Sequence, residues 1–252
     1  MYIYGKNVVK ESLNSNNKII KAYLNNNFND KEIINKLKQL KVKINYTSNN
    51  DLDNKSDHGL HQGIVLQVDD VKTYSYNEII PNINKEYKTI IMLDHLEDPH
   101  NFGAIIRTSY ALGADAIIIP NDRSINITPT VVKTSTGAIN NIPIIRVPNL
   151  SATITKLKKD NFWIVGTDMK GTNYTKIDYK TSICLIIGNE GKGMSNILTK
   201  ECDYIATIPM QNNFNSLNAS VSCGIILSEI MRNRYEQWLW INLSSSRKQW
   251  RC

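Results

Sequence analysis

From Thr89 onward the chain alternates short apolar runs with amphipathic segments, and this alternation limits the possible folds more than any other feature. We predict strands at residues 89–93, 116–119, 142–147, 162–165, 182–187 and 204–208. We predict helices at residues 103–112, 129–136, 151–159, 195–198 and 218–234. Continuous apolar strands between amphipathic helices are typical of a parallel sheet covered on both faces. The pattern therefore predicts a doubly wound α/β domain.

The first 70 residues have a different pattern, which predicts a smaller α/β unit. Strands are expected at residues 19–24, 42–46 and 63–68, and helices at residues 8–13, 31–40 and 48–52. Asp30 suits the N-cap of the second helix, because apolar residues recur behind it at helical spacing. Residues 71–87 contain Pro81 and several asparagines, which favour a linker with a short helical piece. We therefore divide the chain into domains at 1–70 and 88–234, joined by the linker 71–87.

Residues 235–252 do not follow either pattern. They hold Trp238, Trp240 and Trp250 and a polar run, Ser244 to Lys248, without the periodicity of a core segment. Two interpretations are open: a disordered tail, or sequence read beyond the natural end of the gene. We assign no function to this tail.

Composition narrows the class of protein. The formal net charge of +7 favours a polyanionic partner, although an AT-rich genome would also enrich lysine. Four cysteines without a C-x-x-C pair, and His58 and His61 without a third ligand nearby, predict neither a zinc site nor a disulfide framework. No run has the ~18 apolar residues of a membrane span, and the start lacks a signal peptide. A soluble, cytoplasmic protein without a metal is expected.

A glycine-rich loop follows the strand predicted at 182–187. Residues 185–194 read LIIGNEGKGM, with Gly188, Gly191 and Gly193 around one carboxylate, Glu190, and one cation, Lys192. Glycines after a buried strand let a ligand approach the backbone closely. The loop lacks both G-x-x-x-x-G-K-[ST] and G-x-G-x-x-G, so it is no standard phosphate or dinucleotide loop. On its own it indicates either a ligand site or an ordinary glycine-rich turn.

Two more segments combine a strand end with polar residues. Residues 94–107 follow the first strand of the second domain and open a helix, so Asn101 and Arg107 are expected to project near the loop. Residues 208–222 begin at a strand end, and Ser216 or Asn218 would cap the following helix.

Three segments, taken in order, resemble the three motifs of the SpoU/TrmH family, within the SPOUT superfamily. They read N-x-G-A-I-x-R, then L-I-I-G-N-E-G-x-G-M, then I-P-M with S-L-N-A-S-V-S. The family comprises S-adenosylmethionine-dependent RNA ribose 2′-O-methyltransferases, and the resemblance covers residues 90–233. The Y-G-K-N-V-V start and H-Q-G-I at residues 61–64 look like the subfamily that methylates a guanosine in 23S rRNA. That resemblance implies an L30e-like RNA-binding N-terminal domain, a trefoil-knotted catalytic domain and a homodimer.

The resemblance also implies a set of site residues. The family binds S-adenosylmethionine in the knot, needs no metal, and recognises the donor largely through backbone groups. The implied donor-binding residues are Gly188, Glu190, Gly193, Ile208, Met210 and Leu217. The implied catalytic residues are Asn101, Arg107, Glu190, Ser216 and Asn218. Arg107 could act as a base, but an arginine pKa above about 12 favours binding of phosphate and stabilisation of the developing alkoxide.

Other functions stay open at this point. A tRNA ribose methyltransferase is disfavoured by the sizeable N-terminal domain, and a non-catalytic RNA-binding assembly factor by the intact motif residues. A nicotinamide dehydrogenase lacks its glycine fingerprint. His95 and His100 could suggest a general base, but we expect His95 to be non-catalytic and His100 to be a turn residue. We expect Cys223 to pack in the core rather than act as a nucleophile.

Overall fold

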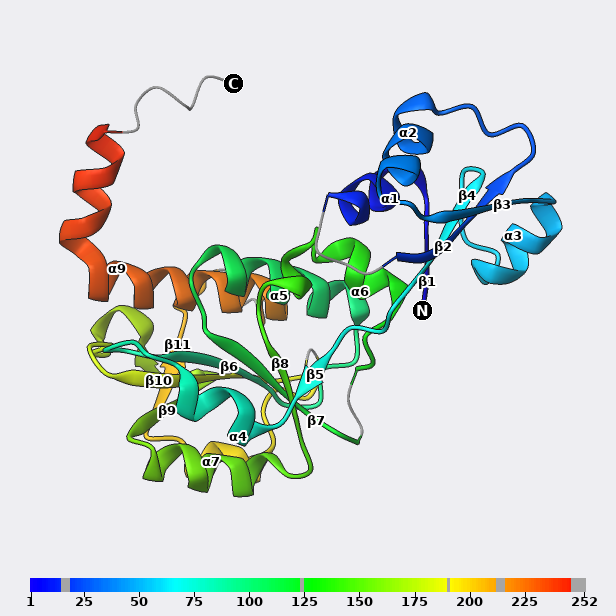
Figure 1. Cartoon of the computed structure of the whole chain (residues 1–252). Helices are drawn as coiled ribbons and strands as arrows, with labels where there is room; N and C mark the ends of the chain where they lie inside the picture. Colours follow the sequence, from blue (N-terminus) through cyan, green and yellow to red (C-terminus); the bar gives the residue numbers. More distant parts are fainter. Residues whose placement is uncertain (15–18, 123–124, 190, 212–215, 246–252) are drawn as a thin grey trace.

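A computed structural model describes residues 1–14, 19–122, 125–189, 191–211 and 216–245, the last of these as backbone only beyond residue 234. The chain forms two sheets. A four-stranded sheet has the order β1-β4-β2-β3, and a seven-stranded sheet has the order β11-β9-β10-β6-β7-β8-β5. Figure 1 shows the smaller sheet and its helices at the upper right, above the larger body. No helix among the described residues is long and apolar enough to cross a membrane.

The smaller sheet is mixed. The structure places its elements at β1 (Tyr2–Tyr4), α1 (Lys6–Leu13), β2 (Ile19–Asn25), α2 (Lys31–Gln39), β3 (Lys43–Thr47), α3 (Asn49–Lys55) and β4 (Ile64–Val68). The Asp30 side chain accepts a hydrogen bond from the backbone N–H of Ile33 at 3.3 Å, so the predicted cap is confirmed. Strand β1 was not predicted, because three residues carry little periodicity and β1 forms only by antiparallel pairing with the distant β4.

The larger sheet is entirely parallel among its described strand pairs. Its strands are β5 (Thr73–Tyr74), β6 (Thr89–Leu93), β7 (Ala116–Pro120), β8 (Ile144–Val147), β9 (Phe162–Asn173), β10 (Ser182–Ile187) and β11 (Tyr204–Thr207). The prediction of a doubly wound parallel sheet is thus confirmed. The sheet's first strand, β5, comes from the segment predicted as a linker.

Helices cover both faces of the larger sheet (Figure 1). One layer contains α5 (Pro99–Ala111), α6 (Pro129–Thr134) and α9 (Ala219–Ser245); the other contains α4 (Tyr76–Ile79), α7 (Leu150–Lys159) and α8 (Asn196–Glu201). Alternate residues of β6 serve the two cores. Ile91 and Leu93 pack with the α5 and α9 side, whereas Ile90 and Met92 pack with the α7 side. All four are fully buried, which explains the unbroken apolar run.

Three element boundaries differ from the prediction by more than three residues. Helix α5 begins at Pro99 instead of Gly103, because Asp98 accepts hydrogen bonds from the N–H groups of His100 and Asn101. Strand β9 continues to Asn173, since it pairs with β11 across an irregularity in register. Helix α9 continues to Ser245, so the segment that we predicted as a tail is helical over its first part.

Candidate functional site

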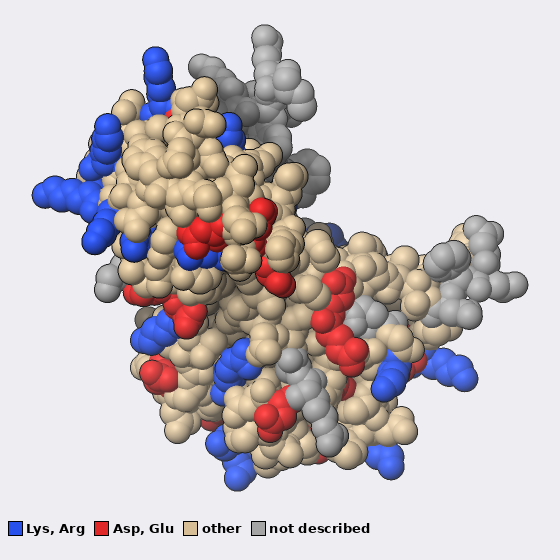
Figure 2. All heavy atoms as spheres, turned by 90° about the vertical axis from the view of Figure 1, so that its right-hand side faces the viewer, with Lys and Arg blue, Asp and Glu red and all other residues tan. Residues whose placement is uncertain are grey.

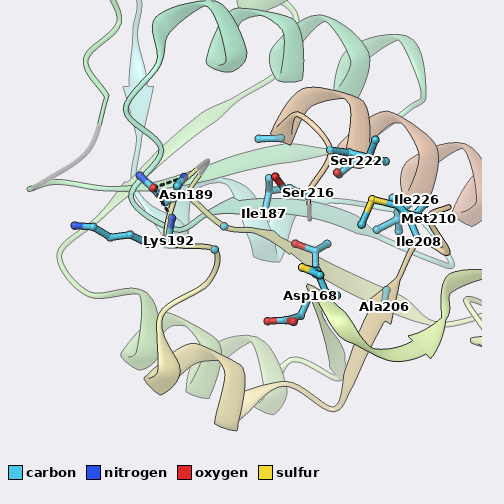
Figure 3. Close-up of a pocket in the computed structure, with 17 residues that line it drawn as sticks. Asp168, Ile187, Asn189, Lys192, Ala206, Ile208, Met210, Ser216, Ser222 and Ile226 are labelled. Atoms are coloured by element: carbon cyan, nitrogen blue, oxygen red, sulfur yellow. Dashed lines mark hydrogen bonds between the residues drawn. The ribbon is translucent and has the colours of Figure 1, made fainter. Parts of the chain in front are cut away.

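A cavity of about 380 Å³ lies at the carboxyl ends of β10 and β11, beside the middle of β9 (Figure 3). The carboxyl ends of adjacent parallel strands are the usual place for a ligand site in an open α/β sheet. The lining comes from four places: Thr167, Asp168 and Met169 on β9; Ile187, Gly188, Asn189, Gly191, Lys192 and Gly193 at and after β10; Ala206, Ile208 and Met210 at β11; and Ser216, Leu217, Ala219, Ser222 and Ile226 before and on α9.

The glycine-rich loop folds back on itself at the cavity wall. Asn189 and Gly193 exchange two backbone hydrogen bonds, at 3.0 and 2.9 Å. A Cβ on Gly188 would lie 2.4 Å from the backbone nitrogen of Met194, so only glycine fits there. Gly193 has φ of +68°, in the left-handed region that favours glycine. Both glycines therefore serve the loop's shape, and the loop is not an ordinary βα turn.

The loop is also held from the neighbouring strand β6. The buried Asp94 carboxylate accepts a hydrogen bond from the backbone N–H of Ser195 at 2.6 Å, where α8 begins. Its other oxygen lies 2.5 Å from Nδ1 of His95. The Asn189 side-chain amide donates to the carbonyl oxygen of His95 at 2.9 Å. Residues 94 and 95 thus hold both ends of the glycine-rich loop.

The first and third motifs meet at a second contact. The Asn218 side-chain amide donates to Oδ1 of Asn101 at 2.7 Å, which joins the start of α5 to the start of α9. Oδ1 of Asn218 accepts from the N–H groups of Ser220 and Val221. Asn218 therefore caps α9, as the sequence allowed, and Asn101 positions that cap. Asn101 is buried, 7% exposed, and does not line the cavity.

The structure brings most of the predicted donor-binding residues to one cavity. Gly188, Gly193, Ile208, Met210 and Leu217 line it, together with Ser216. Figure 3 shows Ile208, Met210 and Ile226 gathered at one end, while the Lys192 side chain extends away from them. Glu190 lies outside the described residues, as does the part of the third motif at 212–215.

Arg107 lies elsewhere. It lines a separate groove with residues of α1, α5 and the turn after α6, and it is not among the residues that line the cavity. The expectation that Asn101 and Arg107 both project toward the glycine-rich loop thus needs correction within one protomer. They are six positions apart on the helix, which places their side chains roughly 120° apart around α5. Asn101 faces α9, whereas Arg107 faces the groove.

Sequence reasoning missed two parts of this site. Thr167, Asp168 and Met169 line the cavity from the middle of β9, next to the irregularity in its pairing with β11, which local sequence does not reveal. Asp94 lies in the segment 94–107, for which no role of this residue was predicted. A carboxylate placed directly after a buried strand needs hydrogen-bond donors, and nearby N–H groups supply them.

The cysteine and histidine side chains that could act as nucleophiles or bases are either buried and protonated or bound to a carboxylate. Burial raises the pKa of Cys223 to about 12 and that of Cys202 to about 12, so both thiols stay protonated at neutral pH. Cys223 is fully buried in the core, as predicted. His95 is bound to Asp94, and His61 lies 3.1 Å from Asp53 in a turn of the N-terminal domain. Within the described residues, no group of three or more His, Cys, Asp or Glu side chains could hold a metal ion.

Comparison with known protein families gives two matches. Residues 88–228 match the SpoU rRNA methylase family, and residues 2–74 match the RNA 2′-O ribose methyltransferase substrate-binding family. A Staphylococcus epidermidis protein assigned to the TrmH family of tRNA/rRNA methyltransferases is 39% identical, covering 93% of this chain and 96% of its own. A Bacillus subtilis protein assigned to the same family is 38% identical, covering 92% and 96%.

Solved structures show the same fold. The AdoMet-bound rRNA methyltransferase from Sinorhizobium meliloti superposes with a TM-score of 0.75 and 26% identity, over 92% of this chain and 86% of that one. The AdoMet complex of the SpoU methyltransferase AviRb from Streptomyces viridochromogenes has a TM-score of 0.76 and 23% identity, over 94% and 91%. The trefoil knot stays a prediction. The chain belongs to the SpoU/TrmH family of RNA methyltransferases.

Proposed function

We propose that this protein transfers a methyl group from S-adenosylmethionine to the 2′-hydroxyl of a ribose in RNA, and that its target is a guanosine of 23S rRNA. One observation carries the proposal. The cavity at the ends of β10 and β11 is lined by the second and third family motifs together. The Sinorhizobium relative of the same fold is an AdoMet-bound rRNA methyltransferase.

The cavity suits the donor in size and chemistry. About 380 Å³ lies within the range of small-molecule sites. Its lining combines apolar side chains such as Ile208 and Met210 with polar groups of Asp168 and Ser222. The close approach of Gly188 to Met194 leaves backbone groups at the wall, where the fixed donors and acceptors of a peptide can recognise an adenine edge. Bound S-adenosylmethionine supplies a methyl group already activated on a sulfonium.

Under this proposal the protein must position the ribose and help its hydroxyl to lose a proton. Arg107 binds a phosphate of the target and stabilises the developing alkoxide, since a guanidinium stays charged at neutral pH. Asn101 orients this region by fixing Asn218 and the start of α9. Ser216 lies in the cavity wall and shapes the third loop. Glu190 keeps its predicted role of holding the second loop or Arg107. Positioning of this kind contributes roughly 7–11 kcal/mol.

We further propose a homodimer. Within one protomer Arg107 and the donor cavity line different hollows, so a second copy offers a way to bring an Arg107 to each cavity. Mixing two inactive variants tests this. Arg107→Ala removes the cation, and Leu217→Arg blocks the cavity from an exposed loop position. Co-refolded mixed dimers should regain part of the activity. Absence of any recovery, with mixed dimers shown to form, would refute a shared site.

RNA binding has a second support in the N-terminal domain. Figure 2 shows lysine side chains projecting from this part of the molecule. Exposed lysines on α2 and at β3 include Lys31, Lys38, Lys41 and Lys43. Cations spread over one lobe attract a phosphate backbone without reading its sequence.

The deciding experiment is transfer of a labelled methyl from S-adenosylmethionine to 23S rRNA and, separately, to tRNA. The modified ribose is then mapped by its resistance to alkaline cleavage. We expect label in 23S rRNA at a guanosine. Label in tRNA alone would overturn the rRNA assignment but keep the reaction. Label in neither RNA, with S-adenosylmethionine bound, would favour a non-catalytic RNA-binding protein.

A further inference from the structure

The groove that contains Arg107 lies between the two sheets and has a volume of about 450 Å³. Its walls come from α1 on one side, and from α5 and the turn around η2 (Ala138–Asn140) on the other. In Figure 1, α1 lies above the helix layer that contains α5 and α6. The lining residues are Glu11, Asn14, Arg107, Tyr110, Ala111, Thr136, Gly137, Ala138 and Asn141.

Two charged side chains of this groove, Glu11 and Arg107, are not used by the fold, whereas the Asn141 amide donates to the carbonyl oxygen of Gly137. Neither the Arg107 guanidinium nor the Glu11 carboxylate has an ion-pair or side-chain hydrogen-bond partner within the part of the chain that the structure describes. They have opposite charges and line the same groove, yet they do not bind each other. Elsewhere the fold uses such groups: Arg232 is bound to Glu229 and Lys158 to Asp203. The groove therefore presents a free cation and a free carboxylate to a ligand.

An aromatic side chain completes the set. Tyr110 follows Arg107 by three residues, so both lie on one face of α5, and its side chain is 49% exposed. The Tyr110 ring is therefore available to a ligand that also contacts the Arg107 guanidinium. With one positive and one negative side chain, the groove is not a simple phosphate channel. Its chemistry suits a flat ring that carries hydrogen-bond donors along one edge.

We propose that this groove binds one unstacked base of the substrate RNA, with Tyr110 stacking on the ring and Glu11 accepting hydrogen bonds from its edge. Single-stranded RNA is commonly read by stacking on aromatic side chains and by hydrogen bonds to the Watson–Crick edge. A carboxylate offers two acceptors, and guanine has adjacent N1–H and N2–H donors on that edge. Arg107 then neutralises the phosphate of the same nucleotide. The inference rests on RNA being the substrate of the proposed function.

Binding of short fluorescent single-stranded RNAs to the full chain tests the proposal. One RNA carries a single guanosine among uridines, and its twin carries inosine, which lacks the 2-amino donor. Wild-type protein should prefer the guanosine RNA by roughly tenfold, and Glu11→Gln should abolish that preference. Tyr110→Ala should weaken binding of both RNAs by roughly tenfold, whereas Tyr110→Phe keeps the ring and should bind normally.

A matched control variant lies outside the groove. Tyr46 is similarly exposed, 55%, but belongs to β3, so Tyr46→Ala should bind both RNAs as wild type. Wild-type affinity for Tyr110→Ala and unchanged preference for Glu11→Gln would overturn the proposal. So would loss of dimerisation in Tyr110→Ala with unchanged RNA binding, because Tyr110 would then be a subunit contact.

Measuring S-adenosylmethionine binding and methyl transfer in the same variants keeps the two proposals distinguishable. Suppose that the base preference depends on the groove residues, but the protein neither binds the donor nor methylates RNA. This result would refute the proposed function and support base binding in the groove. Suppose instead that the protein methylates RNA and its groove variants bind RNA normally. This result would refute base binding in the groove and leave the proposed function intact.

Discussion

The donor cavity and the Arg107 groove are built in opposite ways. At the cavity, the Asp94 carboxylate accepts a hydrogen bond from Ser195 and the His95 carbonyl oxygen accepts one from Asn189, and these contacts hold the glycine-rich loop at both ends. At the groove, Arg107 and Glu11 have no side-chain partner among the described residues. One hollow is shaped in advance by contacts within the chain. In the other, the charged groups of Arg107 and Glu11 stay available to a ligand.

This difference fits two kinds of ligand. A small donor that is the same in every turnover can be recognised by a rigid wall, because no reorganisation is then needed on binding. A large polyanion is attracted by charge and adapts to the surface as it binds. Substitutions in the two hollows should therefore change different measured quantities.

Arg107→Ala should have the largest effect. Removing one cation that stabilises developing negative charge lowers kcat by about 10²–10³-fold. The Kd for S-adenosylmethionine should stay within about twofold, because the proposed partner of Arg107 is the RNA and not the donor. Single-turnover kinetics and calorimetric donor binding measure the two quantities. Lys133→Ala removes an exposed cation from the neighbouring α6 and should leave kcat unchanged. Turnover by Arg107→Ala at the wild-type rate would contradict the assignment.

Asp94→Ala should reverse this pattern and weaken donor binding by about tenfold or more. Loss of its carboxylate leaves the Ser195 N–H without its partner and frees one end of the glycine-rich loop. Asp115 supplies a matched control, since its buried carboxylate accepts from the Thr89 N–H at the opposite end of β6.

Both Asp→Ala variants should lose about 1–3 kcal/mol of unfolding free energy, measured in urea. Only Asp94→Ala should also raise the Kd for S-adenosylmethionine. An equal rise in Asp115→Ala would mean that donor binding follows overall stability, and the idea of a dedicated clamp would fail.

The same contrast explains which parts were predictable from sequence. Strands β6 and β10 were predicted with their observed ends, because burial on both faces leaves an unbroken apolar run that stops at a polar or glycine residue. The cavity residues Gly188, Ile208 and Leu217 were found through motifs that follow strand ends. Buried strands and the motifs at their ends can be recognised from consecutive residues alone.

Features that depend on contacts between distant segments were missed. Asp94 reaches Ser195 across 101 positions, and Glu11 shares a groove with Arg107 only after the two sheets have packed. Periodicity along the chain does not contain this information. The continuation of β9 to Asn173 has the same origin, since pairing with β11 stabilises polar residues that have no strand pattern of their own.

Gly103→Ala should have a moderate effect that is confined to the α5 side. A Cβ at this position would lie 2.5 Å from Cβ of Thr134 and 3.0 Å from the carbonyl oxygen of Val131, so α5 must move away from α6. Overpacking of this kind costs about 1–3 kcal/mol. Because the groove is built on α5 and the turn after α6, RNA affinity should fall more than donor affinity. A larger loss of donor affinity would show that the two hollows are not independent.

Lys192→Ala should have the smallest effect on donor and RNA binding. It tests whether RNA also contacts the glycine-rich loop. Its backbone N–H donates to Oδ1 of Asn189 at 3.2 Å, and this contact survives the substitution. Its side chain extends away from the apolar end of the cavity at Ile208, Met210 and Ile226 (Figure 3). We therefore expect an unchanged Kd for S-adenosylmethionine.

RNA binding by Lys192→Ala should weaken only slightly if this side chain contacts a phosphate. The plot of log Kd against log salt concentration should then lose a slope of about 0.7–0.9, the value for one released counterion. A slope equal to that of wild type would make Lys192 a solvated charge. In that case the RNA does not contact the glycine-rich loop at Lys192. The loop would then serve the donor, and the groove would serve the RNA.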